Sequence, residues 1–293
     1  MSPGTPPAAR RSAASRCTVV TDSSACLTRP ESEGIGIRVL PIELFVGGQE
    51  FHGDDDLADE AVAQALVREE PIKSSAPSAS AYLSAIEEAP TDEVVVLTPA
   101  REFTRMHDNA SVAATLTDRR VRVIDTRTAA GAQGLIAMRA ARLASAGASG
   151  GEIASAAAAD LTRAELVAAL ASLETLQASG RVQAGALTLA KHLGIRPVFR
   201  LHDGRVERIG VPRDEDAAIR RIARAAISRG FAADADAVLM HVADRELAER
   251  LREELGCDAP IARFSPAMAA HTGLGLVGVA WLRAVGRSTE RTS

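Results

Sequence analysis

The sequence has few aromatic residues, few cysteines and little net charge, and each shortage excludes a class of protein. Phenylalanine, tryptophan and tyrosine make up 3% of the 293 residues, too few for the aromatic platforms on which nucleic-acid bases stack. The formal net charge is −4, so the chain lacks the basic field that binds a phosphate backbone. These shortages predict a protein without a nucleic-acid partner.

The cysteines and the apolar runs set further limits. Cys17, Cys26 and Cys257 are too few and too scattered for a disulfide framework or a zinc site, which favours the reducing cytoplasm. No run approaches the ~18 apolar residues of a membrane span. Residues 1–16 carry an arginine pair without the apolar segment of a signal peptide, so we expect a disordered tail there.

Nucleotide-binding motifs are also missing. The chain has no G-x-x-x-x-G-K-[ST] motif and therefore no P-loop. Gly273, Gly275 and Gly278 have the G-x-G-x-x-G spacing, but only 15 residues follow Gly278, which leaves no room for a dinucleotide-binding unit. We expect these glycines to form a tight turn that presents His271. The GASGG segment at 147–151 is predicted to end a helix and to join it to another.

The HGDDD segment at 52–56 has two interpretations. A histidine and three carboxylates within five residues resemble a site for a hard metal ion. Acidic residues also favour the positive end of a helix dipole, and Asp56 suits the N-cap of a following amphipathic helix. We prefer the second interpretation and predict no bound metal.

Strands and helices are predicted to alternate in the first half of the chain. Apolar, β-branched runs of buried-strand type alternate with segments of helical periodicity. The expected strands begin at Cys17 and lie at 37–46, 93–98 and 121–126, and the expected helices follow Asp56 and lie at 80–88, 105–117 and 129–145. Pro41 interrupts the second strand, which suggests an edge or bulged strand. Alternation of this kind predicts a parallel, doubly wound sheet.

The second half has a different pattern. Asp203-Gly204 marks a hairpin, and a helix is expected from about Glu215 to Arg229, ended by Gly230. Its predicted apolar stripe consists of Ile219, Ile222, Ala226 and Ile227. A strand at 237–243, a helix to 255 and the 270–281 segment complete a second α/β unit. The expected division is a tail at 1–16, domains at 17–160 and 161–287, and a tail at 288–293.

Small hydroxyl residues gather beside three predicted turns. They are Thr21 to Ser24, Ser74 to Ser78, and the segment from Thr98 to Thr104. Hydroxyls at strand ends and helix starts donate hydrogen bonds to ligand oxygens, although each taken alone also suits a cap or turn. Thr21, Asp22 and Ser23 are therefore candidate ligand-binding residues.

A set of motifs in fixed order is more specific than any single one. The motifs are VVTDSSACL, VLPIELFVGGQEFHGDDDL, KSSAPS, VIDT, ASGRV, IRPVF, the pairs Asp203-Gly204 and Pro212-Arg213, and AHTGLG. This arrangement resembles the DegV family, the bacterial fatty-acid-binding proteins that serve as the binding subunit of fatty-acid kinase. The resemblance implies a two-domain α/β fold with a DegV-like, mostly parallel N-terminal sheet, a C-terminal α/β domain and a buried acyl chain.

The resemblance also implies a head-group site. Carried over by position, Ser74, Thr104 and His271 would hold the carboxylate of a long-chain fatty acid, and Thr272 and Gly273 belong to the same motif as His271. The sequence departs from the family at Thr104-Arg105-Met106, where S-G-T is usual. Arginine replaces a glycine that would let backbone approach the ligand. Leu274 in place of proline is a milder departure.

The implied role is that of a carrier without a cofactor or catalysis of its own. A separate ATP-dependent kinase would phosphorylate the bound acid, and Arg213 and Arg181 would steer that partner, unless they are ordinary surface or turn arginines. Two other functions stay open. One is an acyl hydrolase or transferase that pairs a hydroxyl nucleophile with His271. The other is a regulatory binder of another amphipathic acid, which Arg105 suggests.

Overall fold

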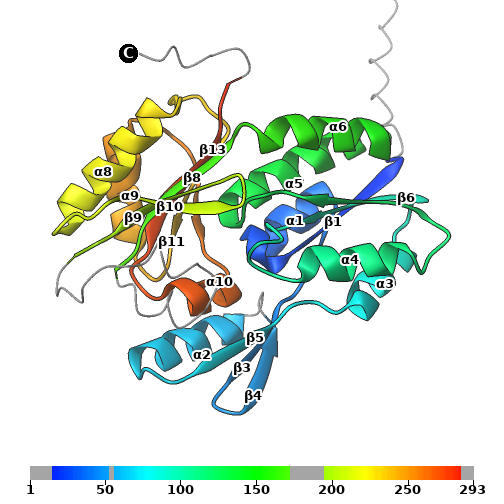
Figure 1. Ribbon diagram of the computed structural model, residues 1–293, viewed down its shortest axis with the longest axis horizontal. Helices are drawn as coiled ribbons and strands as arrows, with labels where there is room; N and C mark the ends of the chain where they lie inside the picture. Colours follow the sequence, from blue (N-terminus) through cyan, green and yellow to red (C-terminus); the bar gives the residue numbers. More distant parts are fainter. Residues whose placement is uncertain (1–14, 53–55, 172–194, 285–293) are drawn as a thin grey trace, which may run out of the picture.

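The computed structural model describes residues 15–52, 56–171 and 195–284 (Figure 1). Its N-terminal part contains a sheet in the order β2-β1-β6-β7, with every neighbouring pair parallel. Its strands are β1 (Cys17–Asp22), β2 (Ile37–Leu40), β6 (Glu93–Thr98) and β7 (Arg120–Asp125). β1 is buried along its whole length because helices cover both faces of the sheet. The predicted parallel sheet is therefore confirmed.

Helices pack on the two faces of this sheet. α5 (Ala130–Ser145) and α6 (Gly150–Leu161) cover one face, and α3 (Ala79–Glu87) and α4 (Met106–Ala114) cover the other (Figure 1). The short α1 (Arg29–Ile35) packs beside α5. The GASGG turn does join two helices, as predicted. Ser149 is the N-cap of α6, and its hydroxyl accepts the backbone N–H of Glu152 at 3.3 Å.

Pro41 separates two strands of different sheets, where the sequence predicted one interrupted strand. β3 (Glu43–Val46) is the centre of a small antiparallel sheet in the order β4-β3-β5, with β4 (Gln49–His52) and β5 (Ile72–Ser75) at its edges. Proline has no N–H to donate to a ladder, so the chain changes sheets there. α2 (Asp56–Val67) packs against this sheet and begins where the sequence predicts, although residues 53–55 lie outside the described part.

The C-terminal part is built on a six-stranded mixed sheet in the order β10-β9-β8-β13-β11-β12. Its strands are β8 (Ala164–Ala169), β9 (Val198–His202), β10 (Arg205–Gly210), β11 (Ala237–His241), β12 (Ile261–Arg263) and β13 (Val277–Leu282). Only β11 and β12 pair in parallel, and the other neighbours are antiparallel. The hairpin at Asp203-Gly204 is confirmed as the β9–β10 connection.

Two amphipathic helices cover the outer face of this sheet. They are α8 (Glu215–Ser228) and α9 (Arg245–Leu255), and the short α10 (Pro266–Thr272) precedes β13. α8 matches its predicted range, and Ile219, Ile222 and Ala226 are buried on its inner side. Ile227 was wrongly placed in the apolar stripe, because its side chain is 57% exposed at the last turn of the helix.

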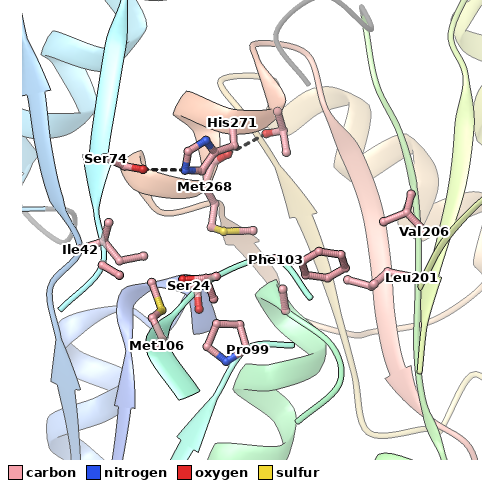
Figure 2. Close-up of a pocket in the computed structure, with 14 residues that line it drawn as sticks. Ser24, Ile42, Ser74, Pro99, Phe103, Met106, Leu201, Val206, Met268 and His271 are labelled. Carbon is pink, nitrogen blue, oxygen red and sulfur yellow. Dashed lines mark hydrogen bonds between the residues drawn. The ribbon is translucent and has the colours of Figure 1, made fainter. Parts of the chain in front are cut away.

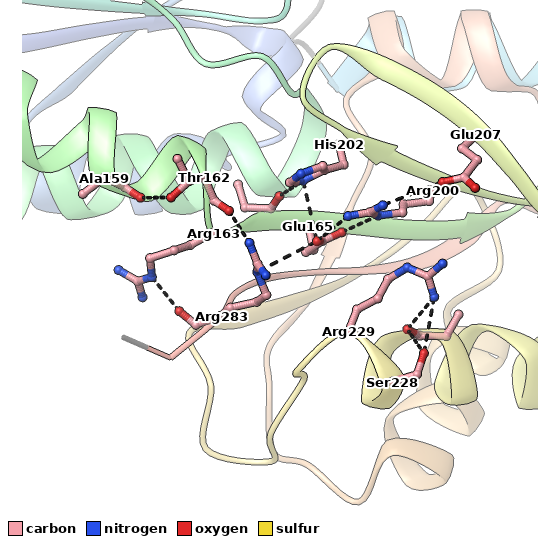
Figure 3. Close-up of polar contacts among 12 residues, drawn as sticks. Ala159, Thr162, Arg163, Glu165, Arg200, His202, Glu207, Ser228, Arg229 and Arg283 are labelled. Atoms are coloured by element: carbon pink, nitrogen blue, oxygen red, sulfur yellow. Dashed lines mark hydrogen bonds and ion pairs between the residues drawn. The ribbon is translucent and has the colours of Figure 1, made fainter. Parts of the chain in front are cut away.

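A buried ion pair links β8 and β9 (Figure 3). It lies on the face of β8 that also carries Val167, which packs with residues of α8. The Glu165 carboxylate is 1% exposed and accepts two hydrogen bonds of 2.7 Å from the Arg200 guanidinium. Because side chains alternate across a strand, this contact fixes Leu166 and Leu201 on the opposite face. That face looks toward α5 and toward the cavity described below.

α5 packs against both large sheets and joins the two parts of the fold (Figure 1). Gly131 and Gly134 let it approach its neighbours closely. A Cβ atom on Gly131 would lie 2.5 Å from Cγ1 of Val238, and one on Gly134 would lie 2.5 Å from the Ala25 carbonyl oxygen. The predicted boundary between the two domains lies between residues 160 and 161, just before the end of α6. Because α5 packs on both large sheets, the packing does not define this boundary, which stays a prediction.

The close approach at Gly131 predicts a clear stability effect. We expect Gly131→Ala to lower the free energy of unfolding by about 1–3 kcal/mol, because the added methyl group overpacks the contact with β11. Gly34→Ala in α1 is the matched control, since a Cβ there meets nothing within 4 Å and alanine is the better helix former. Chemical denaturation checks both variants. Equal stabilities would contradict the tight packing.

Candidate functional site

A cavity of about 170 Å³ lies where the three sheets meet (Figure 2). Its wall is formed by the turn after β1, the small sheet, the segment between β6 and α4, the start of α5, the β9–β10 hairpin and α10. The lining residues are Ser24, Ile42, Ser74, Ala76, Pro99, Phe103, Thr104, Met106, Ala129, Leu201, Val206, Met268, His271 and Thr272. Most of these side chains are apolar, and the polar ones are concentrated at a few points.

Ser74 and His271 form the main polar pair of the cavity. The Ser74 hydroxyl and Nε2 of His271 are 3.0 Å apart, although the residues are 197 positions apart in the chain (Figure 2). Ser74 is held by the pairing of β5 with β3, where it lies opposite Leu44. His271 is in the last turn of α10, whose first turn is capped by the Ser265 hydroxyl. The fold thus brings together the two residues that the KSSAPS and AHTGLG motifs nominate.

Thr104 also lines this cavity, and the departure at residues 104–106 has a local explanation. Arg105 is exposed at the N-cap position of α4, where its side chain makes no capping hydrogen bond. Met106 is buried and contributes its side chain to the cavity wall. The segment therefore supplies a hydroxyl and an apolar group to the cavity, and Arg105 is not among the lining residues.

Gly273 and Gly275 shape a turn after His271, as the sequence predicts, but Gly278 was wrongly placed in that turn, because it lies within β13. Gly273 has φ 80° and ends α10, with its N–H donating to the Ala269 carbonyl at 2.8 Å. A strand follows this turn, whereas a dinucleotide-binding turn is followed by a helix. A Cβ on Gly278 would lie 2.7 Å from the Ala168 Cβ on the paired strand. Thr272 lines the cavity, but its hydroxyl donates to the Met268 carbonyl at 3.0 Å.

Three other predicted ligand residues lie behind the wall of the cavity. The Thr21 hydroxyl donates to the Leu97 carbonyl at 2.8 Å, and the Ser23 hydroxyl accepts the Ile42 N–H at 3.0 Å. Asp22 caps the short 3-10 turn η1 (Ser23–Ala25) through the Ser24 N–H at 3.0 Å. Ser24, which was not among the predicted site residues, is the one of the four that lines the cavity.

Burial has a large effect on the Asp22 carboxyl. Its side chain is fully buried, which raises its pKa from 3.8 to about 6, although hydrogen bonds from Ser24 oppose the shift. An acid with a raised pKa binds protons more tightly in the folded state, so its stabilising contribution is complete near pH 4 and is lost as pH rises through about 6.

We therefore expect Asp22→Asn to flatten the pH dependence of stability. From about pH 4 to pH 7.5 the wild-type protein should lose about 2–3 kcal/mol of unfolding free energy through this group, and the variant should not. Denaturant melts across this range measure the difference. Asp258→Asn at an exposed position is the control and should follow the wild type. Parallel pH profiles for Asp22→Asn and the wild type would contradict the raised pKa.

A second compartment of about 110 Å³ continues the cavity toward the C-terminal sheet. The two share Ala129, Leu201, Val206, Met268 and Thr272 as lining residues. Beyond these, the lining is wholly apolar and consists of Ala130, Leu166, Ala168, Leu170, Phe199, Phe264 and Leu276. None of these residues was predicted from the sequence to line the site. The signal was the alternation in β8 and β9, which puts Leu166, Ala168, Phe199 and Leu201 on one face.

The β9–β10 hairpin is held against the segment between β7 and α5 and lies beside Glu102 in the segment between β6 and α4. The Gly204 N–H donates to the Arg127 carbonyl at 2.6 Å, and the Arg127 guanidinium bonds the Asp203 carboxylate at 2.5 Å. Gly204 has φ 70°, and a Cβ there would lie 2.7 Å from the Glu102 carboxylate. These contacts keep the hairpin closed over this side of the cavity.

The predicted partner-facing arginines do not line the cavity. Arg213 is exposed in the loop that precedes α8. Arg181 lies outside the described residues. In the described part of the chain, no group of three or more metal-binding side chains occurs, and no helix is long and apolar enough to cross a bilayer.

A family model, a relative and a solved structure all relate this chain to one family. The DegV family model matches residues 16–284. A DegV domain-containing protein of Streptomyces coelicolor is 31% identical over 270 residues, which cover 89% of this chain and 96% of that protein. The fatty-acid-binding DegV family protein of Thermus thermophilus has the same fold, with a TM-score of 0.84 and 25% identity over 92% of this chain and 100% of that one.

A third similar protein adds to the fold comparison. The B3 protein of the Streptococcus pneumoniae fatty acid kinase, solved with linoleic acid, aligns with a TM-score of 0.79. It is 22% identical, and the match covers 92% of this chain and 99% of that one. At this identity the similarity shows the fold alone.

Proposed function

The chain belongs to the DegV family, and from this premise we propose that it binds a long-chain fatty acid in the cavity. The carboxylate lies at Ser74, Thr104 and His271, and the acyl chain runs into the apolar compartment beneath α5. The observation that carries the proposal is the shape of the cavity, which has a hydrogen-bonding pair in one compartment and a wholly apolar lining in the other. An amphipathic acid has the same division.

The energetics of such a ligand suit these two compartments. Each buried methylene group contributes about 0.8 kcal/mol, so about fifteen of them contribute roughly 12 kcal/mol before ordering costs. A carboxylate that leaves water must be hydrogen-bonded. The hydroxyls of Ser74 and Thr104 and the His271 ring supply donors, which suffices because the acyl chain provides most of the affinity.

The same proposal includes presentation to a separate kinase. The sequence has no P-loop, and the proposal assigns the binding of ATP and magnesium to that partner. The B3 protein of a fatty acid kinase is among the similar structures, which supports a partner of this kind. Exposed Arg213 is a candidate contact for it. Because the partner uses ATP, the proposal puts the complex in the cytoplasm.

Native mass spectrometry followed by lipid extraction tests the proposal. We expect the purified protein to carry a fatty acid, or to bind oleate once stripped of lipid. Acyl phosphate should form from oleate, magnesium and ATP only when the host's kinase is added. A protein that neither carries nor binds long-chain acids would refute the binding role. Acyl phosphate or ester hydrolysis produced by this chain alone would favour an enzyme.

A further inference from the structure

A chain of buried hydrogen bonds runs from the cavity wall at Ser24 into the core. The Ser24 hydroxyl contacts Oδ1 of Asp22 and lies 2.8 Å from Oε1 of Gln133. The Gln133 amide nitrogen lies 3.0 Å from the Thr21 hydroxyl, which lies 2.8 Å from the Leu97 carbonyl oxygen. Thr21, Asp22 and Gln133 have no exposed surface, so water does not share these contacts.

Counting protons in this chain assigns one to Asp22. The four contacts need four hydrogens, and Thr21, Ser24 and Gln133 supply one each. With the Gln133 amide turned over, its nitrogen would donate to Ser24, and Thr21 would have one hydrogen for two acceptors, Gln133 and Leu97. The orientation with the nitrogen toward Thr21 is therefore the one that can satisfy all four contacts. The Leu97 carbonyl has no hydrogen to give. In that orientation the fourth hydrogen is supplied by a neutral Asp22 carboxyl.

The surroundings of Asp22 agree with a neutral carboxyl. In the described part of the chain, no lysine, arginine or histidine forms an ion pair with it. The titratable groups beside it are the Tyr82 phenol from α3 and the Cys26 thiol, both buried. Burial without a cation raises the pKa of Asp22 to about 6. The proton count and the environment thus point the same way.

The buried partners of Ser24 determine what it offers the cavity. The Ser24 hydroxyl has one hydrogen, which is taken up by Oδ1 of Asp22 or Oε1 of Gln133, so only lone pairs of the Ser24 oxygen remain for a ligand. Any ligand atom that bonds to Ser24 must then be a donor. A carboxylate has only acceptors and a plain acyl chain has neither, so the chemistry that fits is a hydroxyl group.

We propose that Ser24 is a specificity-determining contact that favours long-chain acids with a hydroxyl group on the acyl chain. This inference rests on the proposed binding of a fatty acid in the same cavity. Ser24 lies beside Ile42, Met106 and Pro99 in Figure 2, at a different part of the lining from the Ser74–His271 pair. A hydroxyl on the chain therefore reaches Ser24 while the carboxylate stays at the pair.

Affinities for stearic acid and a positional series of monohydroxystearic acids test the proposal on lipid-free protein. We expect at least one isomer to bind about threefold to tenfold more tightly than stearic acid, and Ser24→Ala to abolish that ratio. Ser23→Ala is the matched control, since Ser23 is the buried neighbour that does not line the cavity. The methyl esters should show the same preference, which excludes a neutral carboxylic acid head as the donor.

The possible outcomes distinguish a failure of this inference from a failure of the proposed fatty-acid binding. The role of Ser24 is overturned if stearic acid binds and no monohydroxystearic acid binds more tightly. It is also overturned if a hydroxy acid is still preferred in Ser24→Ala. Failure of all the acids to bind refutes the proposed function and this inference with it. Each affinity ratio is measured within one variant, so a change in stability does not mimic the effect. Near pH 5, the infrared difference spectrum between the wild type and Asp22→Asn should contain a carboxylic acid band. Absence of this band would refute the proton count.

Discussion

Replacing Ala168 with leucine is expected to lower the affinity for stearic acid by about a hundredfold and to leave that for decanoic acid almost unchanged. Ala168 lies on β8 with its side chain in the far, apolar compartment. The larger side chain would occupy the space of three or four methylene groups. Each displaced methylene costs about 0.8 kcal/mol, which gives roughly 3 kcal/mol in total.

The comparison of chain lengths is the internal control for this variant. Overpacking next to Gly278 will also lower stability, but a loss of folded protein weakens binding of both acids equally. Ala158→Leu at an exposed position on α6 is the second control and should change neither affinity. Calorimetry with both acids decides the matter. Equal losses for the two acids would show that the acyl chain ends elsewhere.

The fold was largely predictable because its central strands have a strong local signal. EVVVLT, for example, has three consecutive valines followed by a leucine, as expected of a strand buried on both faces. The small sheet was not foreseen as a separate sheet, since β3 has only four residues and Pro41 appeared to interrupt a single longer strand. The antiparallel order of the C-terminal sheet depends on long-range pairing, such as that of β8 with β13, which no local pattern encodes.

The site was less predictable because it depends on which side of a turn faces the cavity. Thr21, Asp22, Ser23 and Ser24 are similar in sequence, and the 3-10 turn after β1 determines that Ser24 reaches the cavity. The meeting of Ser74 and His271 required the resemblance to a family, because their motifs lie far apart in the chain. Their role in holding a carboxylate stays a prediction.

Removing the His271 ring is expected to weaken fatty-acid binding by about tenfold to a hundredfold while the protein stays folded. A hydrogen bond to a charged group contributes about 1.5–3 kcal/mol, and the proposed function assigns one to the His271 ring, which lines the cavity beside Ser74. His271→Ala should therefore lower the affinity for stearic acid. Calorimetry on lipid-free protein measures the change.

Methyl stearate separates a head-group contact from simple packing. The ester lacks the carboxylate charge, so its affinity should fall far less than that of the acid when His271 is removed. His52→Ala is the control, because His52 is exposed on β4 and does not line the cavity. Ser74→Ala should likewise lower the affinity for stearic acid more than that for methyl stearate, since the Ser74 hydroxyl is bonded to the same ring. If acid and ester lose affinity equally in His271→Ala, the histidine packs the wall of the cavity and the carboxylate binds elsewhere.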